Sequence, residues 1–204
     1  MVLMNKRGLA GGLLALALSA CAKPPVPVGD DMSLGNPNAP VKVIEYASVA
    51  CPVCGRWYRE VYPAFKAKYI DTGKVYYTSR EMLVGDANEE SMAAAGFLLA
   101  RCAGRDKYFS VVDAIFKNQD DIYSDPKAGL LKIAKANGID ESKFDSCTTD
   151  SAALQALNNR VQGYARDDHV NATPTFVING AAMEPGYHTL AEMDAVIAAP
   201  PAAK

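Results

Sequence analysis

The feature that most constrains the fold is an apolar segment that runs directly into a CxxC motif and a helix-like pattern. Residues 41–48, VKVIEYAS, are rich in apolar and β-branched side chains and predict a buried strand. CPVC follows from Cys51, and from Cys54 to Tyr69 apolar residues recur at the spacing of one helix face. Pro63 lies in this helix and must bend or interrupt it, because proline lacks a backbone N–H. The pattern predicts a strand–helix unit with both cysteines at its junction.

The other segments predict a sheet that is split by helices. Residues 74–84 predict a second strand, and residues 173–183, TPTFVINGAAM, a third with a tight turn at the Asn-Gly pair. Between them, residues 88–168 contain about four helical patterns separated by Gly, Asp and Pro, and the acidic stretch 120–126 is expected to be an exposed loop. A last amphipathic helix covers residues 188–199. This order joins a βαβ unit and a β-hairpin with its helix in one sheet.

Two cysteines one helical turn apart can hold a metal, form a structural bridge or exchange disulfides. A structural zinc site needs a second pair of ligands, but His169 and His188 are far apart and neither has a neighbouring cysteine. A bridge between Cys51 and Cys54 closes so short a loop that it constrains the unfolded chain little. Neither a metal nor another cofactor is therefore expected.

The redox interpretation explains more of the motif. With Cys51 at the N-cap of the helix, Pro52 takes the first helical position, where its missing N–H has no cost. The N–H groups of Val53 and Cys54 then point at the Cys51 sulfur and, with the positive helix end, favour its thiolate. We predict that Cys51 is the nucleophile of thiol–disulfide exchange and that Cys54, which is less exposed, is the resolving thiol.

Residues 1–20 have the pattern of a secretory signal. Lys6 and Arg7 precede an uncharged, Leu- and Ala-rich stretch that is too short to span a bilayer stably. The sequence LSAC, which ends at Cys21, resembles the bacterial lipobox and predicts a lipid on Cys21 that holds the protein at a membrane. Cleavage without lipidation and an uncleaved anchor are the alternatives. Residues 21–32 are proline-rich and are expected to form an extended tether of about 30 Å.

Charge and the remaining cysteines fit an exported protein. Loss of Lys6 and Arg7 from 21 basic residues leaves 19 against 23 acidic ones, and no basic cluster suggests nucleic acid as a partner. In an oxidising compartment Cys102 and Cys147, the two cysteines left over, are expected to form a disulfide. They lack a redox motif, so we interpret the bridge as structural.

The segments VIEYASVACPVC and NATPTFVING, on either side of a helical block, resemble the active-site segments of thioredoxin-fold oxidoreductases. Residues 33–199 as a whole resemble the DsbA family of bacterial periplasmic thiol oxidases. The resemblance implies an α/β, thioredoxin-like fold with an inserted helical subdomain. Its first part would cover residues 33–87, the insertion residues 88–168 and its second part residues 169–204.

The resemblance also implies roles for four residues. Cys51 would be the nucleophile and Cys54 the resolving cysteine. Pro174, after Thr173, would be a cis-proline whose loop lies against the CxxC motif and pairs with an extended client. Glu45 would be a buried acid that accepts the Cys54 proton.

Other interpretations of these positions stay open. Pro174 could be an ordinary trans turn proline, and Glu45 could be a partly exposed strand residue or an ion-pair partner of Lys42 or Arg80. Many enzymes of the family carry a histidine where this chain has Val53, so the lowering of the Cys51 pKa is expected to be smaller than in the strongest oxidants.

The expected function is that of a monomeric periplasmic oxidoreductase, anchored through Cys21, that donates the Cys51–Cys54 disulfide to newly exported proteins through a mixed disulfide. A quinone-linked membrane partner would reoxidise it. Thr173 resembles the isomerases as much as the oxidases, so a disulfide reductase or isomerase is the first alternative. A membrane-anchored copper carrier, with the two thiolates as soft ligands, is the second.

Overall fold

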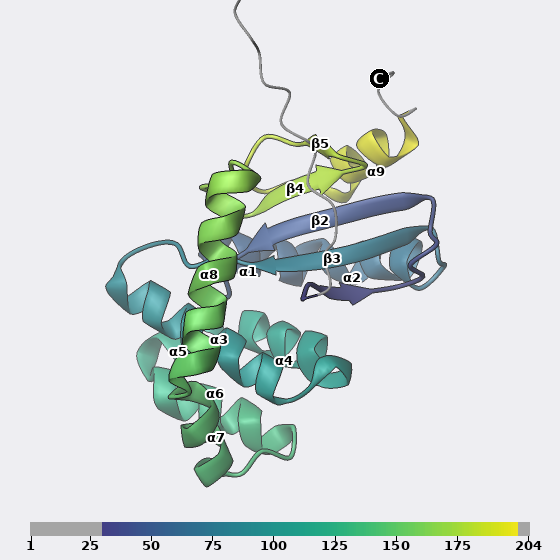
Figure 1. The fold of residues 1–204 in the computed structure, drawn as a ribbon. Coiled ribbons are helices and arrows are strands. Elements are labelled where there is room, and N and C mark those ends of the chain that lie inside the picture. The colour runs from purple at the N-terminus through teal and green to yellow at the C-terminus, as the bar shows by residue number, and fades with distance from the viewer. Residues whose placement is uncertain (1–29, 200–204) are drawn as a thin grey trace, which may run out of the picture.

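The computed structural model describes residues 30–199 (Figure 1). The predicted signal, the lipidation site Cys21 and most of the predicted tether lie outside the described residues. The elements, in chain order, are β1 (Met32–Leu34), β2 (Val41–Ala47), α1 (Pro52–Glu60), α2 (Tyr62–Phe65), the π-helix η1 (Lys66–Ile70), β3 (Val75–Glu81), α3 (Ala87–Cys102), α4 (Arg105–Lys117), α5 (Gln119–Ser124), α6 (Pro126–Ala136), α7 (Glu141–Thr148), α8 (Ser151–Asp167), β4 (Thr175–Ile178), β5 (Ala181–Ala182) and α9 (Leu190–Ala198).

The strands form one mixed sheet in the order β1-β3-β2-β4-β5. The central strand β2 pairs in parallel with β3 and antiparallel with β4. The short strands β1 and β5 run antiparallel along β3 and β4 at the two edges. The predicted combination of a βαβ unit and a β-hairpin in one sheet is therefore confirmed. The edge strand β1 was not predicted, since three residues are too few to show a periodicity.

Helices α3 to α8 follow one another between β3 and β4 and form the helical subdomain, which lies beside the sheet in Figure 1. The long helix α8 leads back from it to β4. About four helices were predicted here, and α5 and α7 are additional.

The prediction of an exposed loop at residues 120–126 is wrong, because these residues form most of α5 and the start of α6. Asp120 and Asp121 lie in the first turn of α5, where the helix dipole favours acidic side chains, and Ile122 is buried. Over residues 30–199, no helix is long and apolar enough to cross a membrane.

Helix α1 packs against both the sheet and the helical subdomain. The ring of Trp57 lies 4.7 Å from that of Phe176 in β4, measured between centroids. The next residue, Tyr58, stacks on Phe116 of α4 at 4.0 Å. The predicted interruption at Pro63 is confirmed, since α1 ends at Glu60 and α2 begins at Tyr62, after the single intervening residue Val61. These contacts fix the start of α1, where the CxxC motif lies, relative to the rest of the molecule.

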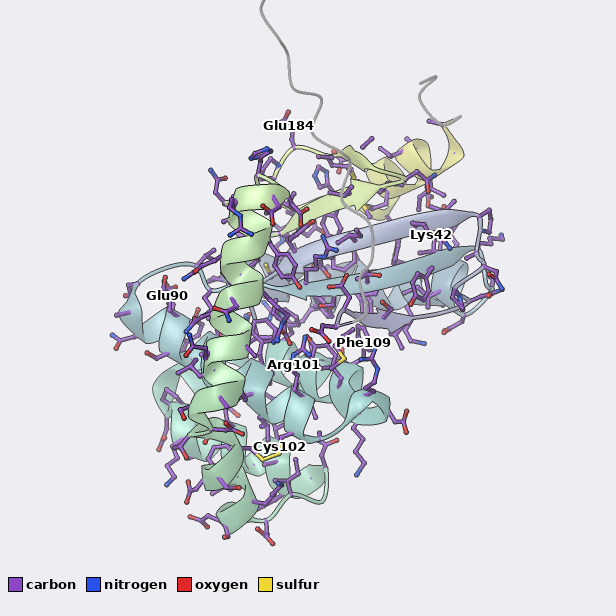
Figure 2. The ribbon with its side chains drawn as sticks, viewed as in Figure 1. Lys42, Glu90, Arg101, Cys102, Phe109 and Glu184 are labelled. Atoms are coloured by element: carbon purple, nitrogen blue, oxygen red, sulfur yellow. A yellow bond between two sulfur atoms is a disulfide. The ribbon has the colours of Figure 1, made fainter. Side chains whose placement is uncertain are left out.

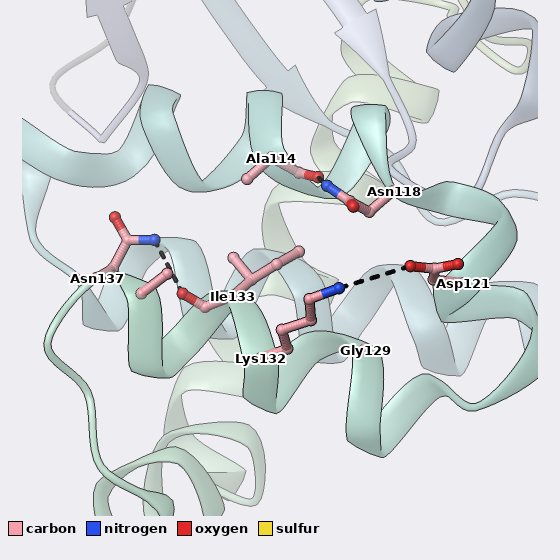
Figure 3. Close-up of a pocket in the computed structure, with 8 residues that line it drawn as sticks. Ala114, Asn118, Asp121, Gly129, Lys132, Ile133 and Asn137 are labelled. Carbon is pink, nitrogen blue, oxygen red and sulfur yellow. Dashed lines mark hydrogen bonds and ion pairs between the residues drawn. The ribbon is translucent and has the colours of Figure 1, made fainter.

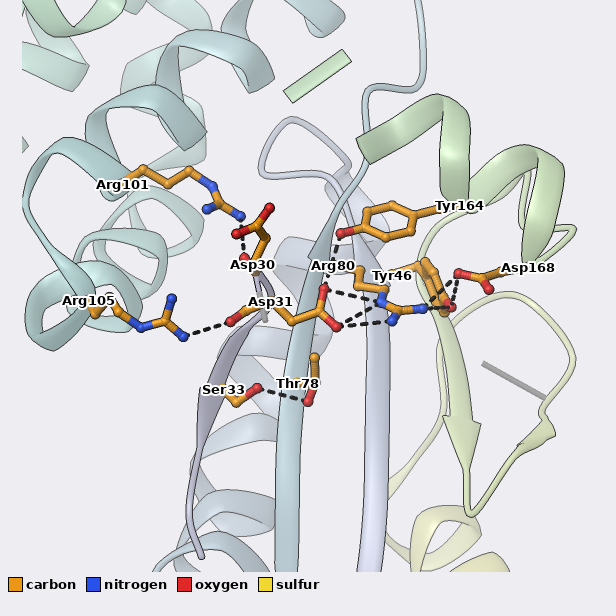
Figure 4. Close-up of polar contacts among 10 residues, drawn as sticks. All are labelled: Asp30, Asp31, Ser33, Tyr46, Thr78, Arg80, Arg101, Arg105, Tyr164 and Asp168. Atoms are coloured by element: carbon orange, nitrogen blue, oxygen red, sulfur yellow. Dashed lines mark hydrogen bonds and ion pairs between the residues drawn. The ribbon is translucent and has the colours of Figure 1, made fainter. Parts of the chain in front are cut away.

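The tether boundary at residue 32 is wrong, because the folded domain begins earlier. Asp31 is 2% exposed, and its carboxylate accepts a hydrogen bond from the Arg80 guanidinium at 3.0 Å (Figure 4). Tyr164 of α8 donates to the same carboxylate at 3.2 Å. Met32 then starts β1. A buried charge needs partners of this kind, so Asp31 is held in the domain and cannot belong to a free tether.

Candidate active site

The CxxC motif opens α1, directly after the turn that follows β2. Cys51 is the N-cap residue, with extended backbone angles of φ −75° and ψ 120°, and Pro52 is the first helical residue. The Cys51 sulfur accepts a hydrogen bond from the backbone N–H of Cys54 at 3.4 Å. This is the capping geometry that the sequence predicted. Cys51 is partly exposed, whereas Cys54 is buried, and neither sulfur is bridged.

The two cysteines differ strongly in acidity. The pKa of Cys51 is lowered from 9.0 to about 6, chiefly by a hydrogen bond from the Cys54 thiol, against the opposing effect of burial. Backbone N–H groups of Cys54 and Val53 lower this pKa further. Burial raises the pKa of Cys54 well above its usual value, and the negative charges of Cys51 and Glu45 act in the same direction. At neutral pH the pair therefore consists of one thiolate, at Cys51, and one thiol.

The loop before β4 lies against the Cys51 sulfur. The peptide bond between Thr173 and Pro174 is cis. The carbonyl oxygen of Thr173 is 3.6 Å from the sulfur of Cys51 and accepts a hydrogen bond from its thiol form. The structure thus brings together two segments that are 122 residues apart in the sequence, as the resemblance implies.

Glu45 is fully buried in β2, close enough to the motif that a negative charge on Cys51 raises its pKa. Tyr77 of β3 donates a hydrogen bond to its Oε2, and the hydroxyls of Tyr58 and Tyr77 are 2.9 Å apart. The other carboxyl oxygen, Oε1, is buried without a hydrogen-bond partner. Burial raises the pKa of Glu45 to about 8, although the hydrogen bond from Tyr77 acts in the opposite direction. This carboxyl is therefore mostly protonated at neutral pH.

The two structural alternatives for Glu45 do not hold. The residue is 0% exposed, so it is not a partly exposed strand residue. The two cations considered as ion-pair partners bind elsewhere: Arg80 pairs with Asp31 and Asp168, and Lys42 Nζ donates to the carbonyl of Pro37. The contact between Glu45 and two tyrosines was not foreseen, because it depends on the packing of β2, β3 and α1.

A disulfide joins Cys102, at the end of α3, to Cys147 in α7, with Cα atoms 6.0 Å apart (Figure 2). It lies wholly within the helical subdomain and joins two cysteines that are 45 residues apart in the sequence. Its two cysteines belong to α3 and α7, whereas the CxxC motif lies at the start of α1.

The helical subdomain also contains a pocket between α4, α5 and α6 (Figure 3). Its lining includes Lys132 and Asp121, whose charged groups are 3.8 Å apart, and Asn137, whose amide caps the carbonyl of Ile133. The lining contains neither a cysteine nor a residue of the predicted site. In the part of the chain that the structure describes, no three His, Cys, Asp or Glu side chains are grouped as a metal site requires.

The fold and this dithiol site define a thioredoxin-like protein with a helical insertion. The family model described as "Thioredoxin" matches residues 28–199. The chain belongs to this family and is DsbA-like. It resembles the crystal structure of Wolbachia pipientis alpha-DsbA1 with a TM-score of 0.76 and 29% identity, over 84% of this chain and 91% of that one. Chlamydia trachomatis DsbA, 19% identical, shares the fold with a TM-score of 0.68, over 84% of this chain and 92% of that one.

Curated relatives agree with this family. A protein of Rickettsia typhi named "Putative protein-disulfide oxidoreductase" is 34% identical over 158 residues, which are 76% of this chain and 57% of the relative. A similar protein of Rickettsia conorii is 33% identical over 154 residues, 74% of this chain and 54% of the relative. The chain thus spans less than two thirds of the length of these rickettsial relatives.

Proposed function

We propose that the protein is an exported thiol–disulfide oxidoreductase that donates the Cys51–Cys54 disulfide to client proteins. The observation that carries the proposal is the asymmetry of the pair. Cys51 is partly exposed at a helix N-cap and accepts the Cys54 N–H at 3.4 Å, whereas Cys54 is buried. The names of the rickettsial relatives and the likeness to alpha-DsbA1 support the same activity.

In the proposed reaction a client thiolate attacks the exposed sulfur of Cys51. The Cys51–Cys54 bond breaks, Cys54 leaves and takes up a proton, and the client is joined to Cys51 in a mixed disulfide. A second client thiolate then attacks the client sulfur of this bond and expels Cys51 as a thiolate. The client loses two electrons, which remain on the reduced Cys51–Cys54 pair. A low pKa makes Cys51 a good leaving group in this last step.

Glu45 is suited to the proton transfer at Cys54. Its carboxyl is buried, and its pKa of about 8 keeps it largely protonated near neutral pH. It can therefore give a proton to Cys54 as that sulfur leaves, and take one back when Cys54 attacks a mixed disulfide in the reverse direction. Thr173 and Pro174 would lie beside the client, since the carbonyl of Thr173 is in contact with the Cys51 sulfur.

Trapping of mixed disulfides tests the assignment. In a Cys54→Ala variant the Cys51 thiolate can attack a client disulfide and release one client thiolate, but no resolving thiol is present to break the mixed disulfide, so clients should accumulate as adducts that a reducing agent releases. Cys51→Ala should form none and should have no activity. Absence of adducts from Cys54→Ala, together with an active Cys51→Ala variant, would refute the proposed roles.

The direction of exchange is tested by the reduction potential of the pair. A value near −120 mV, about that of DsbA, fits a donor of disulfides, whereas one near −270 mV, about that of thioredoxin, fits a reductase. The stabilised Cys51 thiolate favours the first, because it stabilises the reduced form.

Membrane attachment through a lipid on Cys21 is part of the proposal and rests on the sequence LSAC. It predicts that fatty acid labels the wild-type protein and that Cys21→Ala removes both the label and the membrane association. A periplasmic location and reoxidation by a quinone-linked membrane protein complete the proposal. If a quinone-linked protein reoxidises the pair, the oxidised form should not recover in cells whose respiratory quinones are depleted.

A further inference from the structure

Two side chains of α5 bind the turn that presents Cys51. Gln119 is 3% exposed, and its Nε2 donates hydrogen bonds to the carbonyl oxygens of Val49 at 2.9 Å and Cys51 at 3.1 Å. The hydroxyl of Tyr123, one helical turn later, donates to the carbonyl oxygen of Ala50. One short helix of the inserted subdomain therefore binds three successive carbonyl groups of the active-site turn, across about 70 residues of sequence.

The other end of the Gln119 amide is held by α1 itself. Its Oε1 accepts a hydrogen bond from Arg59 Nη1 at 3.3 Å, and the same nitrogen donates to the carbonyl of Phe116 at 2.8 Å. Both ends of the amide thus have partners, and these partners fix which end faces the turn. Because Arg59 lies about two turns after Cys51 on the same helix, Gln119 connects the start of α1 with its later part.

The glycine after the CxxC motif gives Gln119 its space. A Cβ atom at Gly55 would lie 1.8 Å from Gln119 Oε1. The N–H of Gly55 also donates to the Cys51 carbonyl at 3.0 Å, the first hydrogen bond of α1. The Cys51 carbonyl therefore accepts from both the helix and Gln119. The close approach of Gln119 to the first turn depends on the absence of a side chain at position 55.

We propose that Gln119 and Tyr123 are positioning residues for thiol–disulfide exchange, which hold Cys51 at the N-cap of α1 through the backbone of residues 49–51. This inference rests on the proposed function. The peptide groups that these side chains bind determine the backbone angles of Cys51, and those angles aim the Cys54 N–H at the sulfur. The helical subdomain is then part of the reactive site, since α5 sets the geometry in which the thiolate is stabilised.

The test compares Tyr123→Phe and Gln119→Met with the wild-type protein. Each variant keeps the size of the side chain and removes its hydrogen bonds to the turn. The thiolate absorbance of the reduced protein is titrated with pH, and the equilibrium with glutathione gives the reduction potential. We expect the apparent pKa of Cys51 to rise by about half a unit to one unit in each variant, and the equilibrium constant for reduction to fall about three- to tenfold.

Tyr164→Phe is the matched control. It removes a tyrosine hydroxyl that donates to Asp31 at 3.2 Å, away from the active-site turn. It should lower the unfolding midpoint without moving the titration of Cys51. This control separates a loss of stability, which any buried hydrogen bond can cause, from a change at the sulfur.

Unchanged titrations and potentials in Tyr123→Phe and Gln119→Met, with midpoints lowered as in the control, would overturn the inference and leave the two residues a structural role only. If Gln119→Met does not fold, Tyr123→Phe decides the matter alone, because Tyr123 is 40% exposed and its ring is kept. A wild-type Cys51 that titrates like free cysteine would instead remove the proposed function itself. The two failures are thus distinguishable.

Discussion

The substitution Glu45→Gln should stabilise the reduced protein at neutral pH and impair its exchange activity. Burial raises the pKa of Glu45 from 4.5 to about 8 in the folded protein. Below pH 4.5 Glu45 is protonated in both the folded and the unfolded protein, and its contribution to the free energy of unfolding is at its maximum. As the pH rises from 4.5 towards 8, the carboxyl ionises in the unfolded protein but not in the folded one, so this contribution is lost. Between these values each pH unit lowers the free energy of unfolding by about 1.4 kcal/mol. At pH 7 the accumulated loss is about 3 kcal/mol.

Glutamine cannot ionise, so the variant should escape this loss. Its side chain has the same shape, can accept the Tyr77 hydrogen bond and leaves one polar atom without a partner, as Glu45 does at Oε1. These contributions are present at every pH. They therefore cancel when the difference in unfolding free energy between variant and wild type at pH 7 is compared with the same difference at pH 4. The comparison therefore isolates the ionisation of Glu45. Exchange should be slower in the variant, because the group proposed to supply the Cys54 proton is gone.

Urea unfolding of the reduced wild-type and Glu45→Gln proteins at pH 4, 5.5, 7 and 8 measures the effect. Glu60→Gln is the matched control, since Glu60 is exposed and hydrogen bonds from Tyr187 and Arg56 lower its pKa. Its replacement should change the free energy of unfolding in the opposite direction. The variant should become less stable than the wild type as the pH rises through the acidic range, where Glu60 ionises. The reasoning is refuted if the advantage of Glu45→Gln does not grow by at least about 2 kcal/mol between pH 4 and pH 8.

Three further outcomes follow from the structure. The thiolate absorbance of the reduced protein should titrate near pH 6 and report Cys51; a midpoint above 8 contradicts the N-cap argument. Asp31→Asn should lower the free energy of unfolding by about 3 kcal/mol, measured by urea titration, because it leaves Arg80 buried without one of its two carboxylates. Replacement of both Cys102 and Cys147 by serine should cost up to about 4 kcal/mol of stability without moving the Cys51 titration; a shift of that titration would show that the bridge also affects the active site.

The parts of the site that depend on neighbours in the chain could be predicted from the sequence. The N-cap position of Cys51 follows from Pro52 and from the helical spacing after it, and these are local rules. The approach of Thr173 to the sulfur, 122 residues away, came only from the resemblance to a known family. Spacing alone contains no information on which loop lies beside the motif, because that is decided by the order of strands in the sheet.

The partners that adjust the site could not be predicted, since they come from tertiary packing. Tyr77 reaches Glu45 from the neighbouring strand, and Gln119 reaches the Cys51 turn from the start of a six-residue helix whose other residues were expected to form a loop. Neither residue belongs to a motif. The same holds for Asp31, whose burial depends on Arg80 and Tyr164, far along the chain. A polar residue next to a proline-rich stretch gives no local sign that it will be buried.

The opposite shifts of the three ionisable groups at the site have one physical cause. Cys51, Cys54 and Glu45 lie close enough that a negative charge on any one raises the pKa of another, and the latter two are buried. Such a site accommodates a single negative charge at neutral pH, because a second would be both desolvated and repelled. Cys51 has two backbone N–H groups aimed at it, of Cys54 and Val53, whereas buried Cys54 has one, of Ser48, and Cys51 also has partial access to water. The charge therefore resides on the partly exposed sulfur, as the proposed exchange requires, while Glu45 and Cys54 keep their protons.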